Sequence, residues 1–348
     1  MFDGFACSTS EHATLEMQID RLNRRRLVTF LGAVIAWPEI ARAEQSKNLP
    51  LIGFLPLGSP SNRYDASYVE AFRNGLTENG LVEGRDISLE VVWVAKEADY
   101  DDAISDLLRR GAKVLVPAGS TASVAAKRQT STIPIVFVNV GNPVGIKVVE
   151  NLSHPGGNAT GFTDVLAELS SKLVELARTL SKPGAPVGYI WFDKWPDGFR
   201  RLIASEQTAN AIGLALRPRA ISEISELDAL VTDLKSNGMM IDILQPSPFT
   251  YRHRKQIIEA LTNSGLGMVC GWPPASADGA LIGYGPDYAD IYRRAGSYIS
   301  RVLKGENPAE LPVQSPAKFK LVVNTNTAKA LGLEIPTPLL ATADEVVE

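Results

Sequence analysis

The chain has 348 residues, of which 45% are hydrophobic and 21% are charged, so it is long enough to form two domains that each bury a core. This composition excludes a disordered chain, a collagen-like repeat and a disulfide scaffold. The 35 Lys and Arg residues against 39 Asp and Glu residues leave a net charge of −4, which argues against nucleic acid as a partner. Neither the two cysteines, Cys7 and Cys270, nor the three scattered histidines form a metal-binding motif, and we expect no cofactor.

The N-terminal segment has the pattern of a bacterial export signal. Arginines at 24–26 precede an apolar run at 27–37, and Ala41 and Ala43 supply the small residues that a signal peptidase reads. The apolar run is about half as long as a membrane-spanning helix, which indicates a removable signal rather than an anchor. The arginines approximate a twin-arginine signal, although ordinary secretion stays open. We therefore expect removal of residues 1–43 and a periplasmic location.

Beyond the leader, short apolar strands alternate with amphipathic helices. A strand at 49–55 runs into a loop, and Tyr68 and Phe72 mark the helix that follows, which Gly80 is placed to cap. Strands are then predicted at 87–94, 114–116 and 133–138, and helices at 103–110 and 121–129. This alternation is typical of a parallel sheet that is covered on both faces.

A second α/β series begins after the turn at 155–158. Helices are predicted at 167–180, 199–212, 224–236, 252–264, 288–303 and 327–331, and strands at 187–192, 214–220, 239–244, 266–270 and 318–323. No low-complexity linker separates the two series in the sequence. We therefore expect several short crossings between two lobes, with a ligand cleft at the carboxyl ends of the strands.

Several sequence segments, which occur in the same order along nearly the whole chain, carry a family resemblance. They are 51–55, 71–76, 82–86, 133–138, 154–161, 292–296, 299–305 and 311–333. In these segments the chain resembles the bacterial ABC-transporter substrate-binding proteins related to the tryptophan/tyrosine-binding group. The resemblance implies the type I periplasmic-binding-protein fold: two doubly wound, Rossmann-like α/β lobes joined by three crossovers, with a solute bound between them. It also implies ABC permease subunits as partners.

On this pattern we place lobe I at 49–161 and 282–306 and lobe II at 162–281 and 307–344, and we expect a monomer.

Candidate ligand-binding residues of lobe I follow its strands. A strand-to-helix loop at 118–121 offers backbone N–H groups and hydroxyls that can hold a carboxylate, unless its polar side chains merely cap the helix. The first strand-to-helix loop has the same two interpretations, and the loop after the fourth strand offers either amide contacts or turn chemistry. The candidates are Ser59, Gly119, Ser120, Thr121, Asn139 and Asn142.

Lobe II supplies a second group of candidates, which are Asp164, Asp193, Trp195, Ser247, Phe249, Trp272 and Tyr284. Asp164 can pair with a ligand ammonium or cap the following helix, whereas the aromatic side chains either stack on a planar solute or pack. Many relatives have Asp where this chain has Asn142 and Ser247, so another carboxylate or an amide fits as well as an amino acid. The basic run at 252–255 is interpreted as a solvated helix face.

These features together predict a periplasmic solute receptor that closes its lobes around a small polar ligand by hinge motion, without covalent chemistry. A periplasmic domain that senses a ligand for a membrane receptor is the alternative, with the same fold and a different partner. A hydrolase is disfavoured because the sequence contains no nucleophile elbow, phosphate loop or activating histidine motif. A cytoplasmic repressor conflicts with the export signal.

Overall fold

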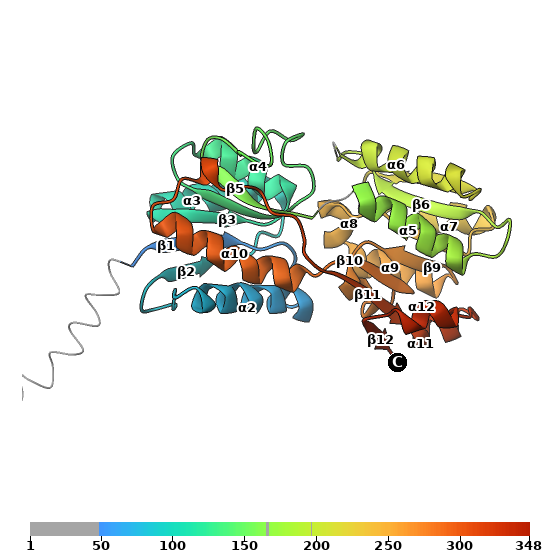
Figure 1. Cartoon of the computed structure of the whole chain (residues 1–348). Coiled ribbons are helices and arrows are strands. Elements are labelled where there is room, and N and C mark those ends of the chain that lie inside the picture. Colours follow the sequence, from blue (N-terminus) through green and yellow to red (C-terminus); the bar gives the residue numbers. More distant parts are fainter. Residues whose placement is uncertain (1–48, 165–166, 196) are drawn as a thin grey trace, which may run out of the picture. The chain divides into compact units, whose positions relative to one another are not determined.

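The computed structural model describes residues 49–164, 167–195 and 197–348, so the predicted export signal lies outside the described residues. Two β-sheets organise the described chain, and helices cover both faces of each sheet (Figure 1). Both sheets belong to one compact unit, Pro50–Glu348. None of the helices in the described part of the chain is both long and apolar enough to span a membrane.

Five parallel strands form the first sheet, in the order β2-β1-β3-β4-β5. They are β1 (Leu51–Leu55), β2 (Ser88–Val91), β3 (Ala112–Pro117), β4 (Ile135–Val140) and β5 (Ala159–Thr163). Successive side chains of a strand face opposite sides of a sheet, so Val136 and Val138 enter one core while Phe137 enters the other. Helices α2 (Arg63–Glu78) and α10 (Tyr288–Leu303) pack in the first core, and α3 (Tyr100–Arg109) and α4 (Ser120–Gln129) pack in the second.

Seven strands form the second sheet, in the order β12-β11-β10-β9-β8-β6-β7. They are β6 (Val187–Phe192), β7 (Leu216–Ile221), β8 (Ile241–Leu244), β9 (Gly267–Cys270), β10 (Ile282–Pro286), β11 (Phe319–Asn324) and β12 (Glu345–Val347). Neighbouring strands are parallel except for β10 and β11, which pair antiparallel. The predicted two-lobed α/β fold is confirmed.

Helices also cover both faces of the second sheet. Those on one face are α5 (Ala167–Leu180) and α6 (Gly198–Ala211), and those on the other are α7 (Leu227–Ser236) and α9 (Arg254–Asn263). The short helices α8 (Pro248–Arg252), α11 (Thr325–Ala330) and α12 (Thr337–Ala341) complete the lobe. The helix predicted at 252–264 is therefore divided at His253, which ends α8 and precedes α9.

The chain passes between the two sheets after β5, between β10 and α10, and before β11. The predicted boundary at 282 is wrong, because β10 forms ladders with β9 and β11 and so belongs to the second lobe. The other boundaries also move by a few residues. Thr163 still pairs within the first sheet, and Gln314 bridges to Phe162, so lobe I extends beyond both 161 and 306. At its C-terminal end, lobe II extends beyond 344 because β12 pairs with β11. The predicted limits differ from these because the sequence pattern does not contain the backbone hydrogen bonds that join the segments to each sheet.

Helices α2 and α10 cross at two glycines. A Cβ atom on Gly75 would lie 1.9 Å from the backbone oxygen of Arg293, and one on Gly296 would lie 2.2 Å from the backbone of Gly75. No side chain fits in this contact, so both positions need glycine for close approach. The crossing fixes α10 against lobe I although α10 follows a strand of lobe II.

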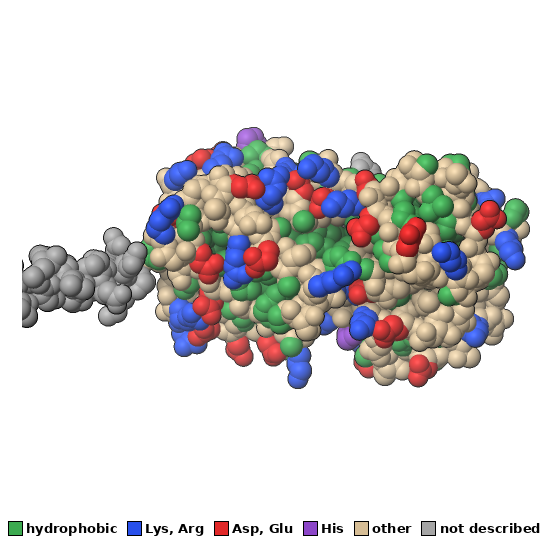
Figure 2. Space-filling view, turned by 90° about the horizontal axis from the view of Figure 1, so that it is seen from below, with side chains coloured by type: hydrophobic (Ala, Val, Ile, Leu, Met, Phe, Trp, Pro, Cys, Tyr) green, Lys and Arg blue, Asp and Glu red, His purple; other side chains and the backbone are tan. Residues whose placement is uncertain are grey.

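Charged side chains of both signs are intermixed on the face of the molecule seen in Figure 2. Many charged side chains in the described part of the chain pair locally on exposed surfaces, as Arg73 does with Glu70 and Glu83. The surface in this view agrees with the balanced composition.

Candidate functional site

A cavity lies between the two lobes at the carboxyl ends of their strands. The space between its walls, counted together with the open solvent at its mouth, is about 520 Å³. Lobe I contributes Leu57, Tyr68, Gly119, Ser120, Asn139, Gly141, Tyr288 and Tyr292, and lobe II contributes Asp164, Trp195, Arg201, Pro246, Ser247, Pro248, Tyr251 and Trp272. Parallel strands place their following loops at one sheet edge, which explains why residues so distant in sequence meet here.

The N-terminus of α4 forms one wall of the cavity. Gly119, with φ of 82°, is the N-cap residue, and no side-chain hydrogen bond caps the helix among the described residues. The alternative in which Ser120 or Thr121 is the N-cap residue is therefore wrong. The N–H groups of the first turn carry the positive end of the helix dipole and suit an anionic group of a ligand.

Asn139, at the end of β4, also lines the cavity with an unusual backbone. Its φ of 57° lies in the left-handed region, which a non-glycine residue adopts at some energetic cost. Its buried Oδ1 has no hydrogen-bond partner within the described part of the chain. An acceptor held in this way is available to a donor group on a ligand.

Asp164 brings a buried carboxylate to the opposite wall. The residue is 8% exposed, and its Oδ1 atom accepts no hydrogen bond from any described residue. Burial raises the pKa of Asp164 to about 6, although the positive charge of Arg201 opposes the shift. A cationic group of a ligand would supply the missing partner and favour the ionised carboxylate.

Arg201 of α6 is held rigidly beside this carboxylate. Its Nε donates to Asp197 Oδ2 at 2.9 Å, its Nη1 donates to the carbonyl oxygen of Pro246 at 2.9 Å, and its guanidinium carbon lies 4.1 Å from the Trp195 ring centroid. Burial lowers the pKa of Arg201, whereas Asp164 and Asp197 oppose that effect. The guanidinium thus fixes the Trp195 ring in the cavity wall and balances part of the acidic charge.

Three tyrosines of α2 and α10, predicted from the sequence only as parts of these helices, form an aromatic wall. Tyr68 stacks on Tyr292 with ring centroids 5.4 Å apart and tilts against Tyr288 at 6.0 Å. All three side chains line the cavity. Each lies in one of the first two turns of its helix, on the buried side, and this position beside the strand ends is the signal that could have identified them.

Seven of the predicted residues lie on the cavity wall, namely Gly119, Ser120, Asn139, Asp164, Trp195, Ser247 and Trp272. Ser247 has a structural task as well, because its Oγ and the Thr250 side chain form a capping box at the start of α8. Trp272 is 3% exposed and meets the ring of Tyr251 edge-on at 5.5 Å. Their contact with a ligand stays a prediction.

The other predicted residues lie away from this cavity wall. Ser59 pairs with the Ser61 hydroxyl, Thr121 sits in the first turn of α4, and Asp193 accepts hydrogen bonds from Ser222 at an exposed position. Phe249 stacks on Phe192 with centroids 4.4 Å apart. Tyr284 lies on β10 and stacks on Phe319, so its predicted place in the cleft is wrong: it packs against the core of lobe II.

Asn142 lines a neighbouring cavity that shares Gly141 and Arg201 with the first. Its Oδ1 accepts a hydrogen bond from the N–H of Gly145 at 3.0 Å, which is the turn chemistry expected as its alternative role. Its Nδ2 lies 3.5 Å from Asp197 Oδ1, so the loop of lobe I approaches the start of α6 in lobe II.

The basic run at 252–255 is only partly a solvated face. Arg254 is 5% exposed and makes ion pairs with Asp65 and Asp278, which corrects the prediction for this residue. Its long side chain reaches from α9 to the start of α2, a contact that only the folded arrangement creates.

The family profile described as ABC transporter substrate binding protein matches residues 63–347. The chain belongs to this family. A tyrosine-binding protein of Clostridioides difficile (strain R20291) is 25% identical over 268 residues, which are 76% of this chain and 76% of that protein.

Solved structures show the same fold. An ABC domain from Streptococcus pneumonia in complex with L-Trp has a TM-score of 0.78 and 21% identity, covering 86% of this chain and 100% of that one. The ligand-free, open structure of a substrate binding protein with adhesive properties from Clostridium difficile has a TM-score of 0.65 and 19% identity, covering 86% and 99%. The substrate-binding family and the type I periplasmic-binding fold are therefore both shown.

Proposed function

We propose that this substrate-binding protein is the periplasmic receptor of an ABC importer and that it closes its lobes around an amino acid, preferably an aromatic one. The observation that carries the proposal is the Asp164 carboxylate, which lines the cavity and whose buried Oδ1 has no partner among the described residues. A ligand ammonium supplies both the charge and the donors that this carboxylate lacks. The partners would be the solute and the membrane subunits of the importer.

The other end of such a ligand has a matching place in lobe I. The first turn of α4 presents backbone N–H groups from Ser120 onward, and no described side chain caps the helix. The N–H of Gly119 already donates to the carbonyl oxygen of Val138 at 2.9 Å. A carboxylate bound there would touch lobe I while the ammonium touches Asp164 in lobe II. One molecule that contacts both lobes stabilises the closed state relative to an open one.

Aromatic side chains on both lobes support a planar side chain on the ligand. Trp195 and Trp272 come from lobe II, and Tyr68, Tyr288 and Tyr292 come from lobe I. Aromatic rings pair favourably with a flat apolar group through stacked or edge contacts. The relative named as tyrosine-binding and the solved domain with L-Trp support the same class.

We infer a binding protein rather than an enzyme, because the family is one of substrate-binding proteins and the polar groups of the cavity suit recognition. The periplasmic location rests on the family and on the export pattern of residues 1–43.

A thermal-shift screen of the chain from Glu44 tests the proposal. The panel contains the amino acids, aromatic acids, purines, sugars and small dicarboxylates, since a ligand that binds only the folded state raises Tm. Two analogues of tryptophan separate the contacts: indole-3-propionate lacks the ammonium, and tryptamine lacks the carboxylate. We expect a saturable shift with an aromatic amino acid, and a much smaller shift with either analogue.

Other outcomes would contradict the proposal in distinct ways. A shift with indole-3-propionate equal to that with tryptophan would remove Asp164 as the ammonium partner. A shift with sugars or purines alone would reject the amino-acid class. Consumption of a bound compound would indicate an enzyme.

A further inference from the structure

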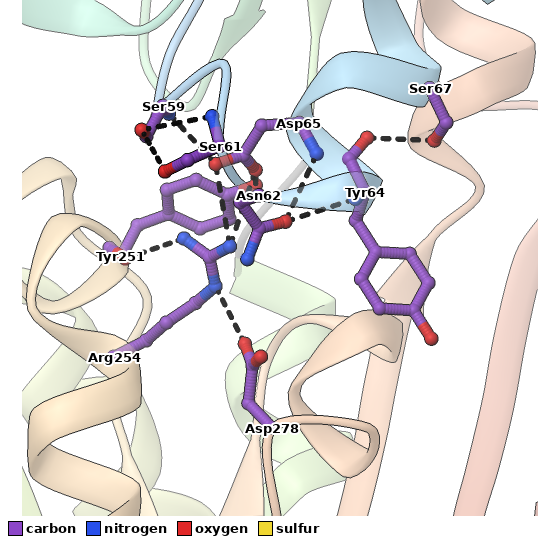
Figure 3. Close-up of polar contacts among 9 residues, drawn as sticks. All are labelled: Ser59, Ser61, Asn62, Tyr64, Asp65, Ser67, Tyr251, Arg254 and Asp278. Atoms are coloured by element: carbon purple, nitrogen blue, oxygen red, sulfur yellow. Dashed lines mark hydrogen bonds and ion pairs between the residues drawn. The ribbon is translucent and has the colours of Figure 1, made fainter.

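A buried polar cluster joins the two lobes beside the ligand cavity. It consists of Asp65 from α2 of lobe I and Tyr251, Arg254 and Asp278 from lobe II (Figure 3). Tyr251 Oη donates to Asp65 Oδ1 at 2.5 Å, and Arg254 Nη2 lies 3.3 Å and 3.4 Å from the two carboxylate oxygens of Asp65. The Asp65 and Arg254 side chains are only 1% and 6% exposed, so this contact is shielded from water.

Each half of the cluster keeps partners on its own lobe. Asp65 accepts from the N–H of Ser59 at 2.9 Å and lies in the first turn of α2, where the helix dipole favours a carboxylate. Arg254 donates through Nε to Asp278 at 3.0 Å and through Nη1 to the carbonyl oxygen of Tyr251 at 3.0 Å. If the lobes separate, both charges remain oriented and partly satisfied, so the contact can break and reform.

The cluster also touches the ligand cavity through one residue. The Tyr251 ring lines the cavity, whereas its hydroxyl binds Asp65, and the Arg254 guanidinium lies 4.2 Å from the centre of the ring. The same side chain therefore belongs to the cavity wall and to the contact between the lobes. We expect a change in the cluster to move this part of the cavity wall.

Space for the Asp65 carboxylate exists because the preceding loop has a glycine. A Cβ atom on Gly58 would lie 2.1 Å from Asp65 Oδ2, and the φ of Gly58 is 98°. The loop thus folds closely over the carboxylate and brings the N–H of Ser59 to it. This arrangement leaves Asp65 Oδ1 directed to the hydroxyl from the other lobe.

We propose that Asp65, Tyr251 and Arg254 form an interlobe latch that holds the receptor closed without a ligand and so sets its affinity. This inference rests on the proposed solute-binding function for its effect on affinity, whereas the closed unliganded state can be measured independently. A charge-assisted hydrogen bond in a buried contact stabilises the state in which it forms. Since only the closed state makes both contacts to the ligand, the latch increases the population that is competent to bind tightly.

The decisive measurement is the distance between the lobes by double electron–electron resonance. Spin labels are placed at the exposed positions Asp102→Cys in α3 and Asp228→Cys in α7, in a full-length Cys7→Ser chain. Cys270 needs no replacement, because it is fully buried. Unliganded wild-type protein should give mainly the short distance of the closed state.

Tyr251→Phe removes the hydroxyl and keeps the ring in the cavity wall, and Asp65→Asn removes the charge with little change of shape. Each should shift the ratio of short to long distances roughly tenfold toward the long one. The Kd for L-tryptophan or L-tyrosine should rise as the closed fraction falls, and saturating ligand should restore the short distance. Tyr284→Phe is the matched control because Tyr284 lies on β10 away from the cavity.

A long distance in unliganded wild-type protein would overturn the latch, as would distance distributions in both variants that match the wild type. Failure of the proposed function has a different signature: neither amino acid binds, while the variants still open the unliganded protein. Unchanged Tm values in the control and only small losses in the two variants would show that the measured changes come from opening and not from unfolding.

Discussion

The buried carboxylate of Asp164 should make the affinity for the ligand depend on pH. Its pKa of about 6 without a ligand means that nearly every molecule has an ionised carboxylate at pH 7.5, whereas about one in eleven does at pH 5. An amino-acid ligand keeps its ammonium over this range, so only the receptor changes charge. If the ionised carboxylate binds the ammonium, the affinity should fall roughly tenfold from pH 7.5 to pH 5, or about 1.4 kcal/mol.

Asp164→Asn tests the origin of that dependence. The variant keeps the shape of the side chain but loses the charge, and we expect affinity at pH 7.5 to fall roughly a hundredfold, because hydrogen bonds to charged groups contribute about 2–3 kcal/mol. The remaining affinity should no longer change between pH 7.5 and pH 5. Isothermal titration calorimetry with the amino acid found in the screen gives both values.

Asp193→Asn is the matched control for this experiment. Asp193 is exposed and accepts hydrogen bonds from Ser222 instead of lining the cavity, so affinity and its pH dependence should match those of the wild type. Equal loss of affinity with pH in wild type and Asp164→Asn would refute the assignment, since the titrating group would then lie elsewhere.

Three further predictions concern stability and the cavity wall. Asp242 is fully buried in β8, and both of its carboxylate oxygens are unpartnered among the described residues. Burial raises the pKa of Asp242 from 3.8 to about 7, so the folded state loses stability as pH rises from about 4 to 7. Relative to Asp242→Asn, the wild type should lose about 2.5 kcal/mol of unfolding free energy between pH 5 and pH 8 in urea titrations. Gly75→Ala should destabilise the protein by about 3 kcal/mol in the same assay, because its methyl group would lie 1.9 Å from the Arg293 backbone oxygen. Trp272→Ala should weaken ligand binding in calorimetry, whereas Tyr284→Ala should leave the Kd unchanged, because only Trp272 lines the cavity.

Each of these three predictions can be contradicted by a specific result. A stability difference between Asp242→Asn and wild type that is the same at both pH values would mean that the buried carboxyl does not titrate in this range. Exposed Asp228→Asn serves as the control for a change of charge alone. A fully stable Gly75→Ala variant would show that α2 and α10 can separate without loss, and a weakened Tyr284→Ala variant would return that residue to the site.

The α/β class and most helices and strands could be predicted from the sequence, because local periodicity expresses which faces of an element are buried. The spacing of apolar residues placed the helix over 288–303, which is α10, and strand 187–192, which is β6. It also identified residues that follow strands, such as Gly119, Asn139 and Asp164, since the carboxyl ends of parallel strands meet in one place whatever the details of packing.

The sequence did not predict which helical side chains reach the cavity or which lobe each crossing segment joins, because both depend on packing in three dimensions. Tyr68, Tyr292 and Arg201 have the spacing of buried helix faces, and that pattern is the same whether the neighbour is a sheet or a ligand cavity. Arg254 has the local pattern of a solvated face, yet Asp65, almost two hundred positions earlier, meets it from the other lobe. Contacts between residues so far apart depend on the chain's path between the lobes, which local periodicity does not encode.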